Sequence, residues 1–283
     1  MTRQYVLLLR CPDRPGIVHE VSGTLFRQGC NIEESAQFSE CGTGMFHMRI
    51  RFSAPDEVEA TGLERALHRL RDGGQAHIGV HDTQRRCRVM ILVSRHGHCL
   101  NDLLFRQRSG LLNMEVSAVV SNHPDFSALA QSYGVPFHHL PVTAETRAQQ
   151  EQKILDLVRS TRTDLVVLAR YMQILSDSAC MALNGRAINI HHSFLPGFKG
   201  ARPYHQAHAR GVKLIGATAH YVTPELDEGP IIEQDVIRVS HNEGPQALAD
   251  IGRDVECTTL ARAVKWHIEH RIILNGSKTI VFD

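Results

Sequence analysis

From residue 88 onward, four short apolar segments constrain the fold more strongly than any other feature of the sequence. The first, Val89–Val93, contains only apolar residues, which is typical of a strand covered on both faces. The others are Val116–Val120, Leu165–Leu168 and Ala187–Ile190. Segments with helical spacing separate these strands, so we expect crossover connections and a mostly parallel sheet. Helices are expected over Leu100–Arg108, Phe126–Tyr133 and Gly244–His270. Ligands of such sheets bind beyond the carboxyl ends of the strands.

The residues before this region follow a different pattern. Strand-like and helix-like segments alternate there in the order strand, helix, strand, strand, helix, strand. These segments are Tyr5–Arg10, Ile17–Gln28, Asn31–Ser39, Met45–Phe52, Val58–Leu70 and His77–His81. This βαββαβ order is typical of a ferredoxin-like split unit. We therefore expect two α/β domains, at 1–82 and 88–283, joined by a linker at 83–87.

Composition limits the classes of protein to which the chain can belong. A length of 283 residues fits one large or two modest domains, and a formal net charge of +1 argues against a nucleic-acid-binding surface. The seven cysteines are scattered and never spaced C-x-x-C, which favours free thiols in a reducing compartment. No secretory segment and no apolar run of membrane-spanning length is present. We expect a cytoplasmic protein that does not bind a membrane or nucleic acid.

Three polar residue types needed for acyl transfer follow the last of the apolar segments. Asn189 and His191 lie two positions apart on a predicted strand that breaks at Leu195-Pro196, so their side chains share one face. Asp227 lies in an acidic turn closed by Gly229-Pro230. An amide can hold an oxyanion, an imidazole can carry a proton and a carboxylate can orient a nucleophile. The alternative is structural, because asparagine often forms turns and a histidine at a strand end is often only hydrogen-bonded.

These residues form a pattern that resembles the catalytic domain of the folate-dependent formyltransferase family. The segments on which this resemblance rests are Asn189-Ile-His191-His-Ser193-Phe-Leu195-Pro196 and the loop from His220 to Asp227. The stretch Leu168–Ser176 resembles the segment that lines the family's folate pocket, although it could also be pure core. The resemblance covers about residues 87 to 275 and implies a Rossmann-like, mostly parallel domain. It implies no cofactor, because 10-formyltetrahydrofolate is the substrate.

The resemblance also assigns roles to individual positions. It implies that Asn189, His191 and Asp227 are catalytic, and that His220 supports Asp227 as a hydrogen-bond partner. It implies a folate-binding wall formed by Tyr171, Met172, Ile174, Leu175, Val222 and Leu226. The neighbouring Arg170 receives no role. No metal is expected, since no histidine group is completed by a carboxylate or cysteine at a familiar spacing; His267 and His270 could share one helix face.

The N-terminal module resembles an ACT domain, a small-molecule sensor. The resemblance rests on Asp13-Arg-Pro-Gly16 before the first helix and Gly29-Cys-Asn31-Ile32 after it. It implies an amino-acid effector, with Asp13, Gly16, Asn31 and Ile32 as candidate ligand-binding residues. Glycine or methionine would fit, since both report on the one-carbon pool. The resemblance also implies pairing of such domains, hence a homo-oligomer, either dimer or tetramer. Alternatively, Gly16 only forms a turn and Asn31 only starts a strand.

The acceptor of the formyl group depends on the loop after the first parallel strand. A phosphorylated acceptor needs a glycine-rich turn whose N–H groups cradle the phosphate. Here the loop carries one glycine, with Arg95, His96 and His98 crowding it. The whole chain instead resembles the branch of the family that fuses an ACT domain to the catalytic domain and uses water. The implied reaction hydrolyses 10-formyltetrahydrofolate to formate and tetrahydrofolate, supplying formate for purine biosynthesis and balancing one-carbon folates.

Two alternatives remain open at this point. One is formyl transfer to glycinamide ribonucleotide, and the other is a non-catalytic sensor of folate or an amino acid. A hydrolase must hold one water near its catalytic groups and exclude an amine, and His98 and Lys199 are candidates for filling that space.

Overall fold

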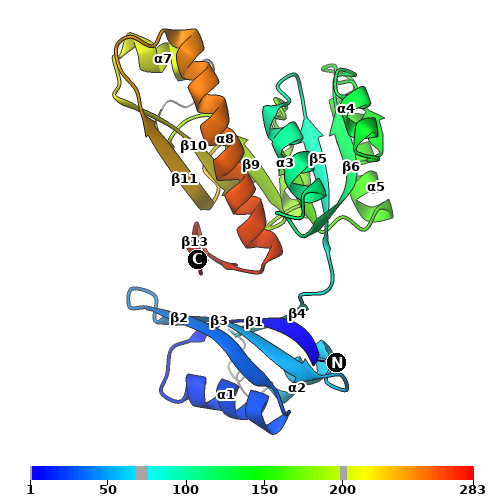
Figure 1. Ribbon diagram of the computed structural model, residues 1–283, viewed down its shortest axis with the longest axis vertical. Helices are drawn as coiled ribbons and strands as arrows, with labels where there is room; N and C mark the ends of the chain where they lie inside the picture. The colour runs from blue at the N-terminus through cyan, green and yellow to red at the C-terminus, as the bar shows by residue number, and fades with distance from the viewer. Residues whose placement is uncertain (1, 68–75, 198–202) are drawn as a thin grey trace. The chain divides into compact units, whose positions relative to one another are not determined.

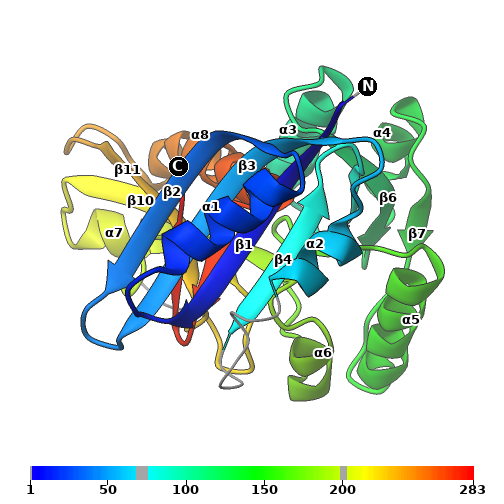
Figure 2. The ribbon, with the colours of Figure 1, turned by 90° about the horizontal axis from the view of Figure 1, so that it is seen from below.

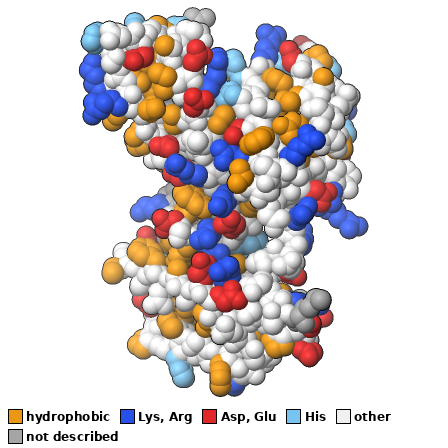
Figure 3. Space-filling view, viewed as in Figure 1, with side chains coloured by type: hydrophobic (Ala, Val, Ile, Leu, Met, Phe, Trp, Pro, Cys, Tyr) orange, Lys and Arg blue, Asp and Glu red, His pale blue; other side chains and the backbone are white. Residues whose placement is uncertain are grey.

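The computed structural model describes residues 2–67, 76–197 and 203–283, which form two compact units. Unit 1 consists of Met1–Arg86 together with Glu269–Ile273 and Ile280–Asp283, and unit 2 consists of Cys87–Ile268 and Leu274–Thr279. On the face drawn in Figure 3, positive and negative side chains are interspersed over both units. None of the helices in the described part of the chain is long and apolar enough to cross a membrane.

Unit 1 is a four-stranded antiparallel sheet with two helices on one face (Figures 1 and 2). Its strand order is β2-β3-β1-β4. The strands are β1 (Thr2–Pro12), β2 (Asn31–Glu40), β3 (Met45–Pro55) and β4 (His77–Asp82). The helices are α1 (Ile17–Arg27) and α2 (Ala60–Ala66). The predicted βαββαβ order is therefore confirmed, while the last residues of the expected second helix, including Leu70, lie outside the described residues.

The core of unit 1 follows from two sequence periods. Leu7 and Leu9 alternate along β1 and are fully buried, because side chains two apart on a strand share a face. Ile17, Val21 and Leu25 lie on one stripe of α1 and are also buried, as expected for an amphipathic helix. The helices therefore bury their apolar stripes against one face of the sheet.

One expectation from the sequence is wrong, and it concerns two histidines near the end of the chain. His267 and His270 do not share a helix face, since α8 (Pro245–Ile268) ends between them and His270 has a left-handed φ of 51°. His267 instead contacts Tyr221 through Nδ1, at 2.8 Å from the tyrosine hydroxyl.

Unit 2 contains a seven-stranded sheet in the order β11-β10-β9-β8-β5-β6-β7. The strands are β5 (Cys87–Val93), β6 (Met114–Ser121), β7 (Phe137–His139), β8 (Leu165–Leu168), β9 (Ala187–His191), β10 (Leu214–Tyr221) and β11 (Ile231–Arg238). Neighbouring strands pair in parallel along the part of the sheet formed by β7, β6, β5, β8 and β9, whereas β10 is antiparallel to both β9 and β11. The predicted mostly parallel sheet is confirmed. A short hairpin of β12 (Ile272–Asn275) and β13 (Lys278–Val281) closes the chain.

The crossover helices of unit 2 cover the faces of this sheet, with α3 and α8 in contact on one of them (Figure 1). Besides α8, the helices are α3 (His98–Arg108), α4 (Ser127–Ser132), α5 (Arg147–Ser160), α6 (Asp177–Ala182) and α7 (Pro203–Ala209). The chain winds from β5 to β6 and β7 in one direction, then returns to β8 on the other side of β5. Such a reversal opens a crevice at the carboxyl ends of the strands. The loops after β5, β8 and β9 therefore meet there.

The buried face of α3 offers a test of this packing. Leu103 is 1% exposed and Leu111 is 58% exposed. We expect Leu103→Ala to lower the free energy of unfolding of unit 2 by about 2–5 kcal/mol, because truncation loses apolar burial and leaves a cavity. Leu111→Ala removes the same atoms from an exposed position and should change it by less than about 0.5 kcal/mol. Urea unfolding followed by circular dichroism measures both, and equal effects would contradict this assignment of the core.

Candidate active site

The antiparallel pairing of β9 with β10 brings the first polar groups of the site together. Asn189 on β9 lies opposite His220 on β10 in the register, and His191 lies opposite Thr218. The amide Nδ2 of Asn189 lies 3.2 Å from Nε2 of His220. Asn189 and His191, two residues apart on one strand, both line the same cavity. The strand carries the two side chains to one face, as the i, i+2 spacing indicates.

The loop after β10 adds the carboxylate. Oδ1 of Asp227 lies 3.3 Å from Nδ1 of His191 and 3.8 Å from Nε2 of His220. The side chains of His191 and His220 are buried, with exposures of 6% and 3%, and that of Asp227 is partly buried, with an exposure of 11%. Asp227 has a left-handed φ of 57°, a conformation that aspartate adopts more readily than most residues. The four predicted residues of the catalytic group are thus brought together.

A glycine makes the close approach of this loop possible. A Cβ at Gly229 would lie 1.7 Å from the carbonyl oxygen of Tyr221 and 3.0 Å from Nδ1 of His220. Only glycine leaves room for the backbone to pass against the end of β10. The turn at Gly229-Pro230 therefore fixes the distance between Asp227 and the two histidines.

Hydrogen bonding assigns the tautomer of His220. Its Nδ1 lies 2.9 Å from the carbonyl oxygen of Tyr221, which can only accept, so Nδ1 carries the proton. Nε2 then accepts from the amide of Asn189 at 3.2 Å. This bond fixes which end of the Asn189 amide is the NH₂ group and leaves its second N–H for another partner. The nearby Asp227 carboxylate contacts His220 electrostatically.

The environment keeps Asp227 ionised. Burial alone would raise the pKa of this carboxyl, but the hydrogen bond from His191 and the nearby His220 ring outweigh it, so the pKa lies well below its usual range. At neutral pH the group is a carboxylate, which can accept a hydrogen bond and a proton. Nε2 of His191 is buried and has no hydrogen-bond partner among the described residues. Such a group is expected to gain a partner when a substrate binds.

A cavity of about 610 Å³ contains these groups, and one side of its wall is apolar. All six residues predicted to bind folate line it, namely Tyr171, Met172, Ile174, Leu175, Val222 and Leu226. Met172, Ile174 and Leu226 are each more than half exposed, which is uncommon for large apolar side chains. Apolar surface left uncovered inside a cavity is typical of a binding site for an aromatic or apolar ligand. Their role in binding folate remains a prediction.

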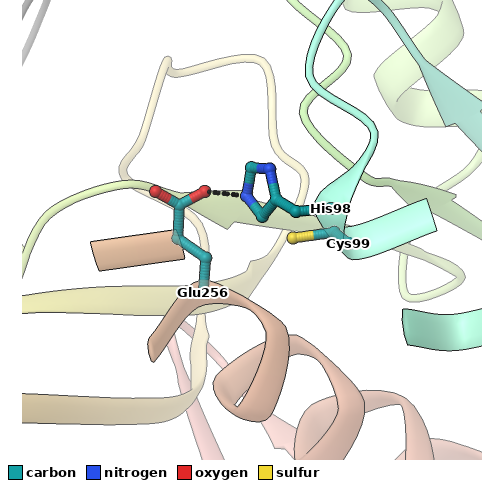
Figure 4. Close-up of side chains that lie close together, drawn as sticks. All are labelled: His98, Cys99 and Glu256. Atoms are coloured by element: carbon teal, nitrogen blue, oxygen red, sulfur yellow. Dashed lines mark hydrogen bonds and ion pairs between the residues drawn. The ribbon is translucent and has the colours of Figure 1, made fainter. Parts of the chain in front are cut away.

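The other side of the wall is polar and centres on Glu256 of α8, a carboxylate that is only 1% exposed. Tyr204 of α7 donates its hydroxyl hydrogen to one carboxylate oxygen at 2.7 Å. His98 of α3 lies 2.8 Å from the other oxygen through Nε2, as Figure 4 shows. Arg170, after β8, approaches that same oxygen at 3.5 Å. Burial raises the pKa of Glu256, but these partners outweigh it and lower the pKa, which keeps the group charged.

The same corner offers three atoms that could bind a metal. One ligand atom each from His98, Cys99 and Glu256 lies within 4.8 Å of the others (Figure 4). Burial and a hydrogen bond with Cys257 raise the pKa of the Cys99 thiol, so a thiolate ligand is disfavoured there. Glu256 already has its oxygens hydrogen-bonded to Tyr204 and His98. We therefore interpret this group as a hydrogen-bonded network, and the expectation that the protein binds no metal remains a prediction.

The candidate effector residues lie at the entry to α1 and on β2. The backbone N–H of Asp13 donates to Gly44, and its carboxylate accepts a hydrogen bond from Ser39. Gly16 has a left-handed φ of 92° and immediately precedes α1. Asn31 and Ile32 begin β2 and are exposed. Gly16 therefore makes the turn that the structural alternative requires, and the binding of an effector remains a prediction.

Sequence reasoning missed three residues of the cavity wall. Glu256 and Tyr204 lie on helices where no local pattern distinguishes them from surface residues. The sequence analysis assigned no role to Arg170. Its position in the loop just after β8 was a usable signal, because loops after parallel strands line ligand sites. Its φ of 63° turns the backbone at the carboxyl end of the strand. Lys199, the other residue expected to fill space near the water, lies outside the described residues.

Comparison with known proteins defines the class of this fold and site. The formyl transferase family model matches residues 87–264, and the ACT domain model matches residues 5–72. A glycinamide ribonucleotide transformylase from Symbiobacterium toebii has a similar structure with a TM-score of 0.67, is 30% identical and covers 70% of this chain and 95% of its own. The chain is a member of the formyl transferase family that carries an ACT domain.

Similarity over nearly the full length of the chain identifies one branch of this family. Formyltetrahydrofolate deformylase of Corynebacterium sp. (strain P-1) is 48% identical, over 98% of both chains. The crystal structure of a formyltetrahydrofolate deformylase from Burkholderia mallei is 52% identical, has a TM-score of 0.94 and covers 99% of this chain and all of its own. The chain therefore belongs to the formyltetrahydrofolate deformylase family, which confirms the resemblance found in its sequence.

The loop after β10 can be tested through its glycine. Gly229→Ala should lower the thermal unfolding temperature, because the added Cβ would meet the Tyr221 carbonyl oxygen at 1.7 Å and force the loop away from β10. Gly244→Ala is the matched control, since a Cβ there would have no neighbour within 4 Å. Differential scanning calorimetry compares the two variants. A Gly229→Ala protein as stable as wild type would contradict the packing described for this loop.

The half-buried His192 beside the catalytic group predicts a pH dependence. Burial, and then the nearby Arg170, lower the pKa of this imidazole to about 3. Between that value and the ordinary histidine pKa of about 6.5, the unfolded chain binds a proton that the folded protein does not. Stability is therefore lost as the pH falls through this window. His192→Gln should flatten the slope in urea unfolding, whereas the exposed His139→Gln should not; unchanged slopes in both would contradict the assignment.

Proposed function

We infer that this protein hydrolyses 10-formyltetrahydrofolate to formate and tetrahydrofolate. One observation carries the inference: an amide, an imidazole and a carboxylate meet at the edge of a partly apolar cavity. The full-length similarity to formyltetrahydrofolate deformylases supports the choice of substrate. The reaction cleaves an amide-type C–N bond with water and needs no cofactor.

The first step forms a tetrahedral intermediate. The oxygen of a water molecule attacks the formyl carbon, a C–O bond forms, and the carbonyl electron pair moves onto oxygen. The second N–H of Asn189 is free to donate to this oxyanion because the first is held by His220. His191 donates from a ring nitrogen. The Asp227 carboxylate accepts the proton that the attacking water loses.

The second step releases the products. The C–N bond breaks as the oxyanion returns its electron pair to carbon, and the leaving nitrogen takes the proton from Asp227, directly or through His191. Tetrahydrofolate and formic acid result, and the latter loses its proton to solvent as formate.

The alternative of formyl transfer to a ribonucleotide is less well supported. A Cβ at Gly97, the one glycine of the loop after β5, would lie 2.3 Å from the Phe126 ring. This glycine therefore allows an aromatic ring to pack against the loop where a phosphate cradle would require open N–H groups. The transformylase similarity also covers only 70% of this chain, against 99% for the deformylase. A non-catalytic sensor would have no need of all three catalytic groups.

The assigned activity suggests a physiological setting. Formate released in this way would supply purine biosynthesis, and the return of tetrahydrofolate would balance the one-carbon folates. The ACT unit would sense glycine or methionine near Asp13, Gly16, Asn31 and Ile32. Pairing of ACT units would make the protein a homo-oligomer, a dimer or a tetramer, in the cytoplasm.

The catalytic assignment predicts the effect of removing one charge. Asp227→Asn should reduce the release of formate from 10-formyltetrahydrofolate about 100- to 10,000-fold, because the amide cannot accept the proton. Asn189→Ala should reduce kcat about 100- to 1000-fold by removing one oxyanion donor. Asp125→Asn, at an exposed position, is the matched control and should keep wild-type activity. Formate release by Asp227→Asn at the wild-type rate would exclude this role.

The sensor assignment is tested separately by calorimetry on the full-length protein. Titration with glycine or with methionine should give saturable binding heat for at least one of them. Asp13→Asn should weaken that binding, because it removes the charge that would pair with the effector's amino group. Binding of neither amino acid, by a protein that still releases formate, would refute the effector proposal and leave the hydrolase intact.

A further inference from the structure

The acceptor side of the cavity poses a problem that the catalytic group alone does not solve. The same fold occurs in a transformylase that is 30% identical to this chain. The name of that protein, glycinamide ribonucleotide transformylase, indicates an amine acceptor of nucleotide size, whereas a hydrolase must let water in and keep amines out. Attack by either nucleophile proceeds through the same oxyanion, so Asn189, His191 and Asp227 cannot distinguish them. The distinction has to lie in the polar side of the wall.

We propose that the ring of Tyr204, held in place by Glu256, closes the acceptor side of the cavity and makes this site specific for water. The proposal rests on the inferred hydrolase activity. Tyr204 is 9% exposed and lines the cavity together with Glu256 and His192. The centroid of its ring lies 6.1 Å from that of His192, whose own ring lies 5.2 Å from the catalytic His191. The tyrosine is thus the second aromatic ring away from the reacting centre.

The position of this ring is fixed on two sides. Its hydroxyl donates to Glu256 at 2.7 Å, and burial and the adjacent carboxylate raise the tyrosine pKa so that the hydroxyl keeps its proton. Behind the ring, a Cβ at Gly252 of α8 would lie only 2.0 Å from the hydroxyl oxygen. The ring therefore rests directly on the backbone of α8 on this side. A larger acceptor cannot displace it without breaking the bond to Glu256.

The network also occupies the carboxylate that an acceptor would meet. Tyr204 and His98 each occupy one oxygen of Glu256, and Arg170 lies 3.5 Å from the second oxygen. A sugar hydroxyl could bind Glu256 only by displacing Tyr204 or His98. A water molecule needs only two to four polar partners and little volume. The residues that enclose the polar side thus admit water and disfavour an amine.

Competition between water and a small amine tests the proposal. Formyl-labelled 10-formyltetrahydrofolate is incubated with glycinamide, and the ratio of formylglycinamide to formate is measured. In the transfer step, the amine nitrogen bonds to the formyl carbon, the bond to the folate nitrogen breaks, and the amine's proton moves to that nitrogen. Because both products form from the same substrate in the same reaction, this ratio does not depend on the overall turnover rate of a variant. Wild type should give formate almost alone.

Two substitutions at one position separate the ring from its hydroxyl. Tyr204→Ala opens the wall and should raise the ratio by about tenfold or more, the scale on which a closed pocket rejects additional groups. Tyr204→Phe keeps the ring but loses the bond to Glu256, so it should raise the ratio by less than Tyr204→Ala does. Tyr133→Ala is the control, because this tyrosine contacts Arg108 and does not line the cavity. If Tyr204→Ala does not fold, Tyr204→Leu, which also removes the ring, replaces it.

The outcomes distinguish this inference from the activity on which it rests. A wild-type ratio in the folded Tyr204→Ala protein, with formate still released, would overturn the closure by Tyr204 and leave the hydrolase standing. Equal increases in the Ala and Phe variants would also overturn it, since the ring would then not be the barrier. Absence of formate release by the wild-type protein would refute both the function and the inference.

Discussion

The antiparallel pairing of β9 with β10 is the constraint on which the site depends. In a mostly parallel sheet, the antiparallel strand β10 sets His220 directly across from Asn189 and lets the loop after β10 return to the edge where β9 ends. The histidine then orients the amide, and the loop brings Asp227 to His191. A slip of one residue in this register would turn every side chain of β10 to the opposite face. The catalytic geometry is therefore a property of the sheet.

Around this centre, burial and charge divide the cavity into two sides with different tasks. The apolar side leaves large side chains uncovered, which suits a flat aromatic ligand. The polar side has its strongest group, Glu256, already bonded to Tyr204 and His98. The apolar side is therefore prepared to bind, and on the polar side the carboxylate of Glu256 already has its partners. This asymmetry is what a hydrolase requires, because its second substrate is water.

The sequence predicted the features that depend on local pattern and on short motifs. The apolar segments of β5, β6, β8 and β9 could be read because buried parallel strands have few polar residues. Strand β10 was not predicted, since Gly216, Thr218 and His220 interrupt its apolar run. The Asn-x-His spacing and the loop with Asp227 pointed to the grouped residues. Glu256 was not predictable, because only its contacts in space with His98 and Tyr204 distinguish it from a surface glutamate.

The central claim is that the groups at the end of β9 direct water onto a formyl carbon. The most direct measurement is the isotopic composition of the formate produced from 10-formyltetrahydrofolate in water enriched with oxygen-18, analysed by mass spectrometry. The account predicts that the formate formed carries one oxygen atom from the solvent. Formate that contains no oxygen-18 would contradict it. A formylated amine as the only product, when an amine is added, would also contradict it.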